Sequence, residues 1–597
     1  RGLGDVYKRQ LWYTVKCISF AGRIDVIKEI EIKQHEIDEK NKILRLTVSC
    51  RTDQSCKGEK VRMSLLFEGS SGKRYYPVSA GWKQDNEENR IYEDVLDVEL
   101  GNIFFETYPQ EEKVTVSIAV CDAESFWTKT EPLLYLDGSL FQKEHKTKGR
   151  ASQIGSVILY LLCTLLLPLW IIDGILAQMG LHKLHKSAEG HSGKSAIFYH
   201  AHGLVKDWTG HGYSLREIKT DYFKRCYDRA CRKIPHTEGI LFLSERRVEE
   251  GGNLSLIRSR VREMGWNFQE FLVEVPVHRL KYRQIRQCAE KAATARVIVL
   301  EDFYPQLHAL SVRKDTKILQ MWHACGAFKL FGLSELGIVD HLQQSTRNHR
   351  NYAAALASSR GIVPFYSEAF GIDENKVRAA GVPRTDIFFD EKYRIDIRRK
   401  LLKKYPMCAD KKVILFAPTF RGSGNKTAFY PMEKFPLGEI MDCISQDTVL
   451  ILKNHPFVRE KWTIEEKYSQ RVLDLSEGEN INDLLFITSV LITDYSSVIF
   501  EASLLKIPML FYAFDLRDYL KKRDLYFDFA SFVPGRIVAD VKELKQALNN
   551  VLKQPEEQEK ASGMSRDKFR ELFLGALDGH STERTLELIT ELLETDD

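Results

Sequence analysis

The sequence predicts an α/β protein with two doubly wound, Rossmann-like domains, preceded by an all-β, sandwich-like region and a hydrophobic segment. Three observations support this organisation. Residues 11–142 alternate apolar and polar side chains, residues 154–172 carry no charge, and short apolar runs alternate with helical stretches from about residue 190 onward. A chain of 597 residues is also too long for a single hydrophobic core.

The N-terminal region, residues 11–142, is predicted to be a β-sandwich-like accessory domain. Ile43–Ser49, Val61–Phe67 and Val114–Val120 alternate with a period of two, and turn-forming residues separate these runs. The region contains no constellation of residues typical of a catalytic site. We therefore expect a fragment that starts near Lys186 to fold without it.

The next region, residues 150–186, is predicted to attach the protein to a membrane surface. Ile154–Ile172 is a charge-free run of threshold length for a membrane span. Basic residues flank the run on both sides and Pro168 lies near its end, which favours an interfacial or re-entrant anchor over a true span. A buried core helix is the third interpretation.

Two parallel α/β domains are predicted for residues 190–405 and 406–597. The apolar runs that predict buried strands are Ala196–Tyr199, Ile240–Leu243, Phe271–Val275, Val297–Leu300 and Ile318–Met321 in the first domain, and Val413–Ala417, Val449–Leu452, Val490–Thr493 and Met509–Tyr512 in the second. A charged helix around Tyr393–Lys404 connects the two sets. Two such domains that face a cleft form the GT-B architecture, and open parallel sheets bind ligands at the carboxyl ends of their strands.

The composition disfavours several classes of function. Lys and Arg total 87 against 83 Asp and Glu, a net charge of +4, which gives no support to a nucleic-acid-binding role. The eleven cysteines form no CxxC pair and no zinc-type cluster, so we expect reduced thiols and no metal site. No GxxxxGK[ST], GxGxxG or HExxH motif is present, which disfavours an NTPase, a dehydrogenase or a zinc protease.

A first candidate site follows the strand that ends at Met321. The segment Trp322–Lys329 places His323 where a strand ends, and Gly326 permits a close approach of the backbone to a ligand. A histidine there can act as a general base, because its ordinary pKa lies near neutral pH. The alternative is a structural histidine in a packed turn.

Three further candidate segments follow strands of the second domain. Pro418–Gly424 contains Arg421, whose guanidinium could bind phosphate in a bidentate manner, and Lys453–Pro456 supplies a cation and a second imidazole. Each of these cations alone is more typical of a solvated loop.

The third segment of this domain, Asp494–Glu501, opens a predicted helix. Asp494 or Ser496 could cap it, so that Ser496, Ser497 and free N–H groups face a phosphate, while Glu501 holds ribose hydroxyls. The alternative is a simple N-cap, which would account for one serine.

The ordered motifs of the two domains resemble the CDP-glycerol glycerophosphotransferases of teichoic acid synthesis. The motifs that carry the resemblance are Trp322–Lys329, Gly381–Asp386, Ala417–Arg421, Lys453–Pro456 and Thr493–Ser497. The resemblance spans roughly residues 190–580 and does not cover the sandwich-like region. Cys325 stands where the family more often has Gly or Ala.

The resemblance implies a bacterial enzyme at the cytoplasmic face of the cell membrane, peripheral or monotopic, with a GT-B fold. Residues 190–405 would form the acceptor side and residues 406–597 the CDP-donor side. CDP-glycerol would be the donor and CMP would be released, with a hydroxyl of a lipid-linked polyol-phosphate or glycan as acceptor and no tightly bound cofactor or metal.

The resemblance also implies roles for individual residues. His323 and His455 would be the catalytic histidines, with His323 as the base. Arg421, Ser496, Ser497 and Lys453 would bind the donor diphosphate, and Asp494 and Glu501 the nucleotide and its ribose. Gly326, Pro383, Arg384, Asp386 and Thr419 complete the motif residues.

Other functions remain open from the sequence alone. CDP-ribitol or another polyol donor would suit the same motifs. A GT-B glycosyltransferase that uses a nucleotide sugar shares the fold and a helix-bound diphosphate, although the ordered Trp-His-Ala and Asp-Tyr-Ser-Ser motifs disfavour it. A membrane-anchored glycan-binding protein whose transferase site has decayed is a non-enzymatic alternative that the presence of both histidines disfavours.

Overall fold

The computed structural model describes residues 27–141 and 215–595 with gaps at residues 53–61, 71, 79–81, 84–89, 104–112, 123–125, 131, 238, 247, 249–250, 339–341, 345, 423–426, 521 and 555–563. The predicted anchor, residues 150–186, and the predicted strand Ala196–Tyr199 lie outside these residues. Within the described ranges, no helix is long and apolar enough to cross a membrane.

The N-terminal part of the structure contains two antiparallel sheets. The first has the order β1 (Ile27–Asp38), β2 (Ile43–Thr52), β6 (Arg90–Glu99) and β5 (Trp82–Lys83); the second has β4 (Gly72–Val78), β3 (Arg62–Gly69), β7 (Lys113–Asp122) and β8 (Phe126–Lys129), with β9 (Leu134–Asp137) also paired to β7. Alternate residues such as Leu44, Leu46, Leu65 and Val116 form a shared, fully buried core. The antiparallel strands of the predicted sandwich are therefore present in the described residues.

The first α/β domain is built on a six-stranded parallel sheet. Its order is β11 (Phe268–Leu272), β10 (Ile240–Ser244), β12 (Val297–Leu300), β13 (Lys317–Gln320), β14 (Ala354–Leu356) and β15 (Val377–Arg378). The helices of this part are α5 (Leu215–Lys233), α6 (Asn253–Glu263), α7 (Tyr282–Thr294), α8 (Pro305–His308) and α9 (Val363–Phe370). β10 and β12 are buried at every position, as strands covered on both faces must be.

The second α/β domain repeats this design. Its parallel sheet has the order β18 (Val472–Asp474), β17 (Thr448–Leu452), β16 (Lys412–Phe416), β19 (Val490–Thr493), β20 (Met509–Tyr512) and β21 (Arg536–Val538). The helices are α10 (Glu391–Lys404), α11 (Leu437–Cys443), α12 (Ile481–Leu485), α13 (Val498–Leu504), α14 (Leu516–Leu520), α15 (Phe529–Phe532), α16 (Val541–Lys553) and α17 (Arg566–Leu574). The predicted α/β class with parallel sheets is confirmed, and α10 matches the helix predicted around Tyr393–Lys404.

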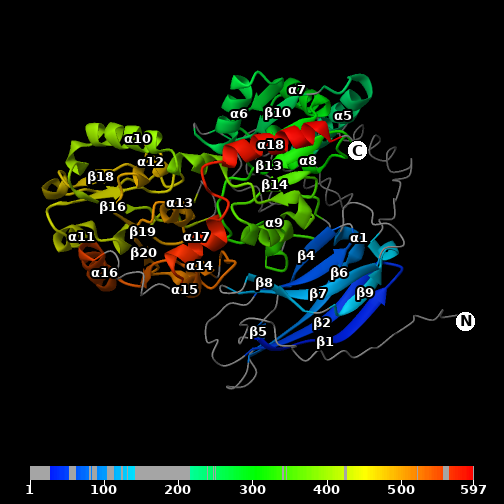
Figure 1. Ribbon diagram of the computed structural model, residues 1–597, viewed down its shortest axis with the longest axis horizontal. Coiled ribbons are helices and arrows are strands. Elements are labelled where there is room, and N and C mark those ends of the chain that lie inside the picture. The colour runs from blue at the N-terminus through cyan, green and yellow to red at the C-terminus, as the bar shows by residue number, and fades with distance from the viewer. Residues whose placement is uncertain are drawn as a thin grey trace, which may run out of the picture.

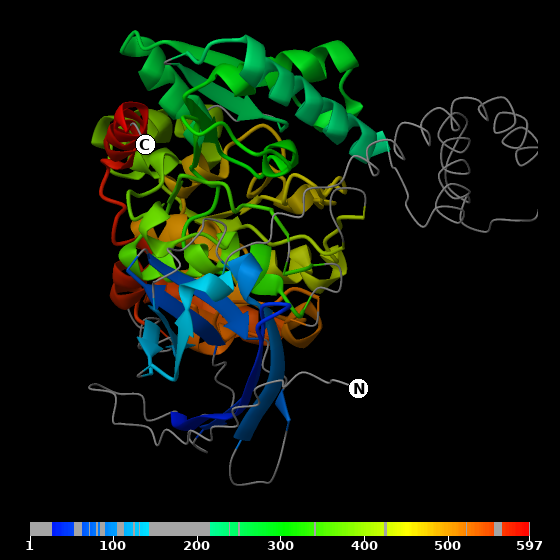
Figure 2. The ribbon, with the colours of Figure 1, turned by 90° about the vertical axis from the view of Figure 1, so that its right-hand side faces the viewer.

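The three parts of the molecule lie against one another. In Figure 1 the first α/β domain, in green, lies beside the second, in yellow and orange, and the sandwich, in blue, lies next to α9. Figure 2 shows the same three parts after a rotation of 90° about the vertical axis. The loop after β13 pairs with the second domain, since the Leu330 amide donates to the Asp524 carbonyl at 3.0 Å and the Tyr526 amide to the Phe328 carbonyl at 2.9 Å.

The C-terminal helix α18 (Ser581–Glu594) returns to the first domain rather than staying with the second sheet. Its apolar face, including Leu586 and Ile589, packs in the same core as β10 and β12. Asp386 fixes the start of the helix, because its two carboxylate oxygens accept the amides of Ser581 at 3.0 Å and Thr582 at 2.7 Å. The residue predicted as a motif position therefore acts as a helix cap from a distant segment.

Replacing Asp386 with alanine should loosen α18. Loss of an N-terminal capping side chain typically costs about 1 kcal/mol, and here it also frees the helix from η8 (Pro383–Phe388). We expect faster hydrogen exchange of the α18 amides in Asp386→Ala, whereas Asp386→Asn, which keeps an acceptor, should stay close to the wild type. Unchanged protection of α18 in the alanine variant would contradict this role.

Candidate active site

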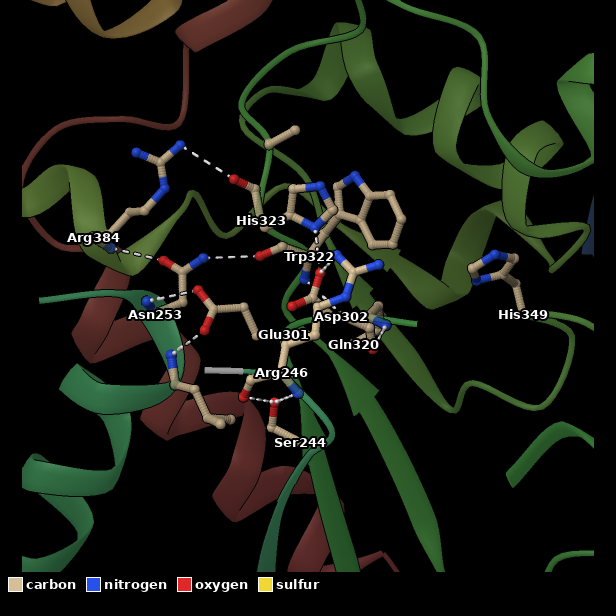
Figure 3. A network of polar contacts seen from close by, with 12 residues as sticks. Ser244, Arg246, Asn253, Glu301, Asp302, Gln320, Trp322, His323, His349 and Arg384 are labelled. Carbon is tan, nitrogen blue, oxygen red and sulfur yellow. Dashed lines mark hydrogen bonds and ion pairs between the residues drawn. The ribbon is translucent and has the colours of Figure 1, made fainter. Parts of the chain in front are cut away.

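A histidine–carboxylate pair lies at the carboxyl edge of the first sheet. Asp302 follows β12 and His323 follows the neighbouring strand β13, so the two side chains meet above the sheet. The His323 Nδ1 lies 3.1 Å from Asp302 Oδ1, and Arg246 Nη1 lies 3.0 Å from the same oxygen (Figure 3). The His323 side chain is 48% exposed, so its remaining edge is open to solvent.

Asp302 is held as an anion. Burial opposes its charge, but the hydrogen bond from His323 and the charges of His323 and Arg246 outweigh that penalty and lower the pKa of Asp302 below its ordinary value. A carboxylate that accepts from Nδ1 fixes the tautomer of the imidazole and leaves Nε2 as the proton acceptor. This is the arrangement that a general base requires.

The peptide before His323 is strained and is fixed by hydrogen bonds. Trp322 has φ +58°, which is uncommon for a bulky residue. Its amide donates to Gln320 Oε1 at 2.9 Å, and its carbonyl accepts from Asn253 Nδ2 at 2.8 Å. Gln320 Nε2 in turn donates to the Asp302 carbonyl at 3.2 Å and to the Tyr352 hydroxyl at 3.0 Å. One amide side chain therefore sets the positions of both members of the pair.

Arg384, from the predicted Gly381–Asp386 motif, joins the two domains beneath this loop. Its Nη2 donates to the His323 carbonyl at 3.2 Å and to Glu501 Oε1 of α13 at 2.5 Å. Glu501 is only 4% exposed. These contacts favour a positioning role for Glu501 and give no support to the predicted contact with ribose. Pro383 opens η8 at its first turn and fixes the start of the segment.

Arg421 does not extend into solvent as an anion clamp. Its Nε and Nη2 form a bidentate pair with Asp515 at 2.7 and 2.8 Å, and its Nη1 donates to Asp494 Oδ2 at 2.9 Å and to the Thr419 carbonyl at 2.6 Å. Asp494 also accepts the Thr419 amide at 2.7 Å. Asp494 therefore fixes the loop after β16 through these hydrogen bonds. It is not the cap of α13 that the sequence suggested.

Lys453 is likewise directed into the protein. Its Nζ donates to the carbonyl oxygens of Ser476 at 3.1 Å and Glu479 at 2.6 Å, and the residue is 8% exposed. These bonds tie β17 to the loop before α12. The geometry thus favours a structural role over the predicted contact with the diphosphate.

A separate positive cluster is formed by Lys329, Arg523 and His455, here called the Lys329 cluster. The pKa of Lys329 is lowered to about 8, chiefly by burial and also by the charges of Arg523 and Arg421, while the charge of Asp494 opposes this shift. Burial, followed by the charges of Lys329 and Arg523, lowers the pKa of His455 to about 4. Burial of cationic groups that also repel one another identifies a place where an anion would be stabilising.

His455 is neutral near pH 7 in this cluster and still offers a donor. Its Nδ1 accepts the Phe457 amide at 3.2 Å, so the proton of the neutral ring lies on Nε2. Arg523 lies over the Phe420 ring at 4.7 Å and donates to the Gly422 carbonyl at 3.3 Å, so this loop holds its guanidinium. The cluster can therefore supply two cations and one N–H group to a single anion.

The remaining predicted residues lie close to α13. Ser497 is exposed and Ser496 is half-buried, with its hydroxyl accepting the Val498 amide at 3.4 Å. Gly326 has φ +63°, and a Cβ there would lie 2.3 Å from the Phe500 ring. Packing of this loop against Phe500 of α13 therefore requires a glycine at position 326.

Three functional candidates were missed in the sequence. Asp302 is the second residue after the buried strand Val297–Leu300, a position that could have identified it. Lys329 ends the Trp322–Lys329 motif but was not assigned a role. Arg523 lies in an irregular segment, and only its pairing with residues 328–330 brings it to the site.

Comparison with known proteins gives one family and several relatives. Residues 226–591 match the family model described as CDP-Glycerol:Poly(glycerophosphate) glycerophosphotransferase. The teichoic acid poly(ribitol-phosphate) polymerase of Bacillus spizizenii is 38% identical over 378 residues, which cover 63% of this chain and 60% of that protein. The chain therefore spans less than two thirds of the length of this relative.

Two further relatives and one solved structure extend the comparison. The teichoic acid ribitol-phosphate polymerase TarK of Staphylococcus aureus is 39% identical over 59% of this chain and 69% of that protein. The teichoic acid glycerol-phosphate primase of Bacillus subtilis is 30% identical over 50% and 74%. The structure of the wall teichoic acid polymerase TagF has a TM-score of 0.52 at 18% identity, over 66% of this chain and 97% of that chain, which shows a shared fold.

The Lys329 cluster should give anion binding a characteristic pH dependence. An amine with a pKa of about 8 is charged below that pH and loses its charge above it, so affinity should fall as the pH rises. CDP-glycerol is a suitable probe because its diphosphate diester keeps a constant charge. We expect about fivefold to tenfold weaker binding at about pH 9 than at about pH 7 by isothermal titration. Lys329→Arg, which stays charged, should remove most of this dependence; an equal dependence in the variant would exclude Lys329.

Proposed function

Because the chain belongs to the CDP-glycerol:poly(glycerophosphate) glycerophosphotransferase family, we propose that it transfers a polyol phosphate from a CDP-activated donor to a hydroxyl of a teichoic acid acceptor. The observation that carries this proposal is the 322–330 loop. It begins with the His323–Asp302 pair and ends with a cation of the Lys329 cluster. A base and an anion site on one rigid loop are the two components that phosphoryl transfer requires.

The chemical step follows from this geometry. Nε2 of His323 takes the proton of the acceptor hydroxyl while its oxygen bonds to the phosphorus of the polyol phosphate. The bond from that phosphorus to the bridging oxygen breaks, and the electron pair leaves with CMP. Asp302 stabilises the imidazolium, and Lys329, Arg523 and the Nε2–H of His455 stabilise the charge that develops on the diphosphate. We propose the hydroxyls of Ser496 and Ser497, which precede α13, as further donors to the diphosphate.

Ribitol phosphate is the preferred candidate for the transferred group. The two relatives named for ribitol phosphate are 38% and 39% identical, whereas the relative named for glycerol phosphate is 30% identical. This ranking favours CDP-ribitol as the donor over CDP-glycerol, the donor predicted from the sequence. A lipid-linked acceptor and attachment to the cytoplasmic face of the membrane, through residues 150–186, complete the proposal.

Donor identity can be tested directly. Purified protein is incubated with CDP-ribitol, CDP-glycerol or a nucleotide sugar in the presence of a polyol-phosphate acceptor, and both CMP release and acceptor elongation are measured. We expect CMP release with CDP-ribitol, slower release with CDP-glycerol and none with the sugar donor. Transfer from the nucleotide sugar alone would support the glycosyltransferase alternative instead.

The His323–Asp302 pair predicts a graded loss of turnover. His323→Ala removes the base and should lower kcat by about 10²–10⁴-fold with little change in the donor KM. Asp302→Asn keeps the shape but removes the charge that orients the imidazole, so it should lower kcat by less. Circular dichroism and the melting temperature control for folding. Normal turnover of folded His323→Ala protein would refute the assignment.

A further inference from the structure

A buried ionic contact joins the N-terminal sandwich to the first α/β domain. Arg62 of β3 is 8% exposed and pairs with Glu368 of α9, which is fully buried. Ser64, two residues along the same strand, donates to the other oxygen of Glu368. Both oxygens of the Glu368 carboxylate therefore accept hydrogen bonds from the sandwich. Ser334, of the first α/β domain, donates to it at 2.6 Å.

Arg62 and Ser334 also contact Tyr526 of the second α/β domain. The Tyr526 hydroxyl donates to Ser334 Oγ at 2.9 Å, and the Arg62 guanidinium lies 5.1 Å from the centre of the Tyr526 ring. Tyr526 is 1% exposed. A cation over an aromatic ring at a buried site is an attractive interaction. Arg62 therefore contacts residues of both transferase domains.

Tyr526 is adjacent to the Lys329 cluster through the backbone. Its amide donates to the Phe328 carbonyl at 2.9 Å, next to Lys329, and it follows Arg523 by three residues. The short segment 523–526 thus carries Arg523 of the cluster and pairs with the 322–330 loop, which carries Lys329. A displacement of Tyr526 would move both cations relative to each other.

Further contacts fix the sandwich against the same domain. Arg74 donates to the Gly371 carbonyl at 2.8 Å, and the Tyr75 hydroxyl donates to Glu374 at 3.1 Å. Gln344 donates to the Asp97 carbonyl at 2.6 Å and accepts the Glu99 amide at 2.9 Å. Both sheets of the sandwich take part, so its orientation on the transferase is defined.

Burial makes these contacts necessary. A carboxylate that is removed from water is strongly destabilising unless it is paired and hydrogen-bonded. Removal of the sandwich would take away Arg62 and Ser64 and would expose to solvent the Glu368 carboxylate that they bind. A fragment that starts near Lys186 would lack these contacts, and its folding without the sandwich stays a prediction.

We propose that the N-terminal sandwich is a positioning element of the donor site, acting through Arg62, Glu368 and Tyr526 on the Lys329 cluster. This inference rests on the proposed function, because it assigns the cluster to the donor diphosphate. Arg62 is a positioning residue and does not touch the substrate. Its loss changes how the two cations are held, so the affected quantity is the use of the donor.

The test uses the full chain and a double-mutant cycle. Arg62→Met, Glu368→Gln and the double variant are compared with the wild type for donor KM, kcat of CMP release from CDP-ribitol and CDP-glycerol, and melting temperature. We expect Arg62→Met to raise the donor KM on the order of tenfold and to lower the melting temperature. The double variant should recover part of both losses, since no unpaired charge remains.

Two further variants keep the test decisive. Arg45→Met removes an arginine of the same sandwich whose pair with Asp97 is exposed, 56% and 51%, and should behave as the wild type. Tyr526→Phe removes only the hydroxyl bond to Ser334 and should raise the donor KM without unfolding the protein. An unchanged donor KM in a folded Arg62→Met or in Tyr526→Phe overturns the inference. A wild type that releases no CMP would instead contradict the proposed function.

Discussion

The backbone pairing between residues 328–330 and 524–526 is the contact on which the rest of the site depends. It joins a loop of the first sheet to an irregular segment of the second domain through two hydrogen bonds, at 2.9 and 3.0 Å. Backbone bonds have fixed directions, so this pairing sets the distance between the base at His323 and the cations that follow. Together with other contacts between the domains, such as the Arg384–Glu501 pair, it holds the carboxyl edges of the two sheets in place.

Paired charges reinforce this contact from beneath. Arg384 binds the carbonyl of the base residue and the Glu501 carboxylate of the other domain. Arg421 is enclosed by Asp494 and Asp515. Buried pairs of this kind contribute less to net stability than to a unique arrangement, because either partner alone would be strongly unfavourable. The charged residues near the contact between the two domains therefore divide into those that hold the site together and those that could bind an anion.

A cationic residue in a motif is not always a ligand of the phosphate. Arg421 and Lys453 have the residue type expected of a phosphate ligand, yet their N–H groups bind protein carboxylates and carbonyls. Around Lys329 and Arg523, burial first and then the positive charges of neighbouring residues lower the pKa of Lys329 and of His455. Unfavourable electrostatics within the protein is the physical sign of a site prepared for a negative ligand. Chemical type alone does not distinguish the two groups.

The sequence by itself determined the α/β class, the parallel strands and the position of His323, since hydrophobic periodicity and the place of a residue at a strand end are local properties. It also identified Arg384 and Asp386 as motif residues without showing what they bind. Tertiary structure decided the partners: Asp302 for His323, Glu501 for Arg384, the start of α18 for Asp386, and Glu368 for Arg62. Each of these contacts joins residues far apart in the chain, and hydrogen bonds and ion pairs depend on distances that only the packed fold establishes.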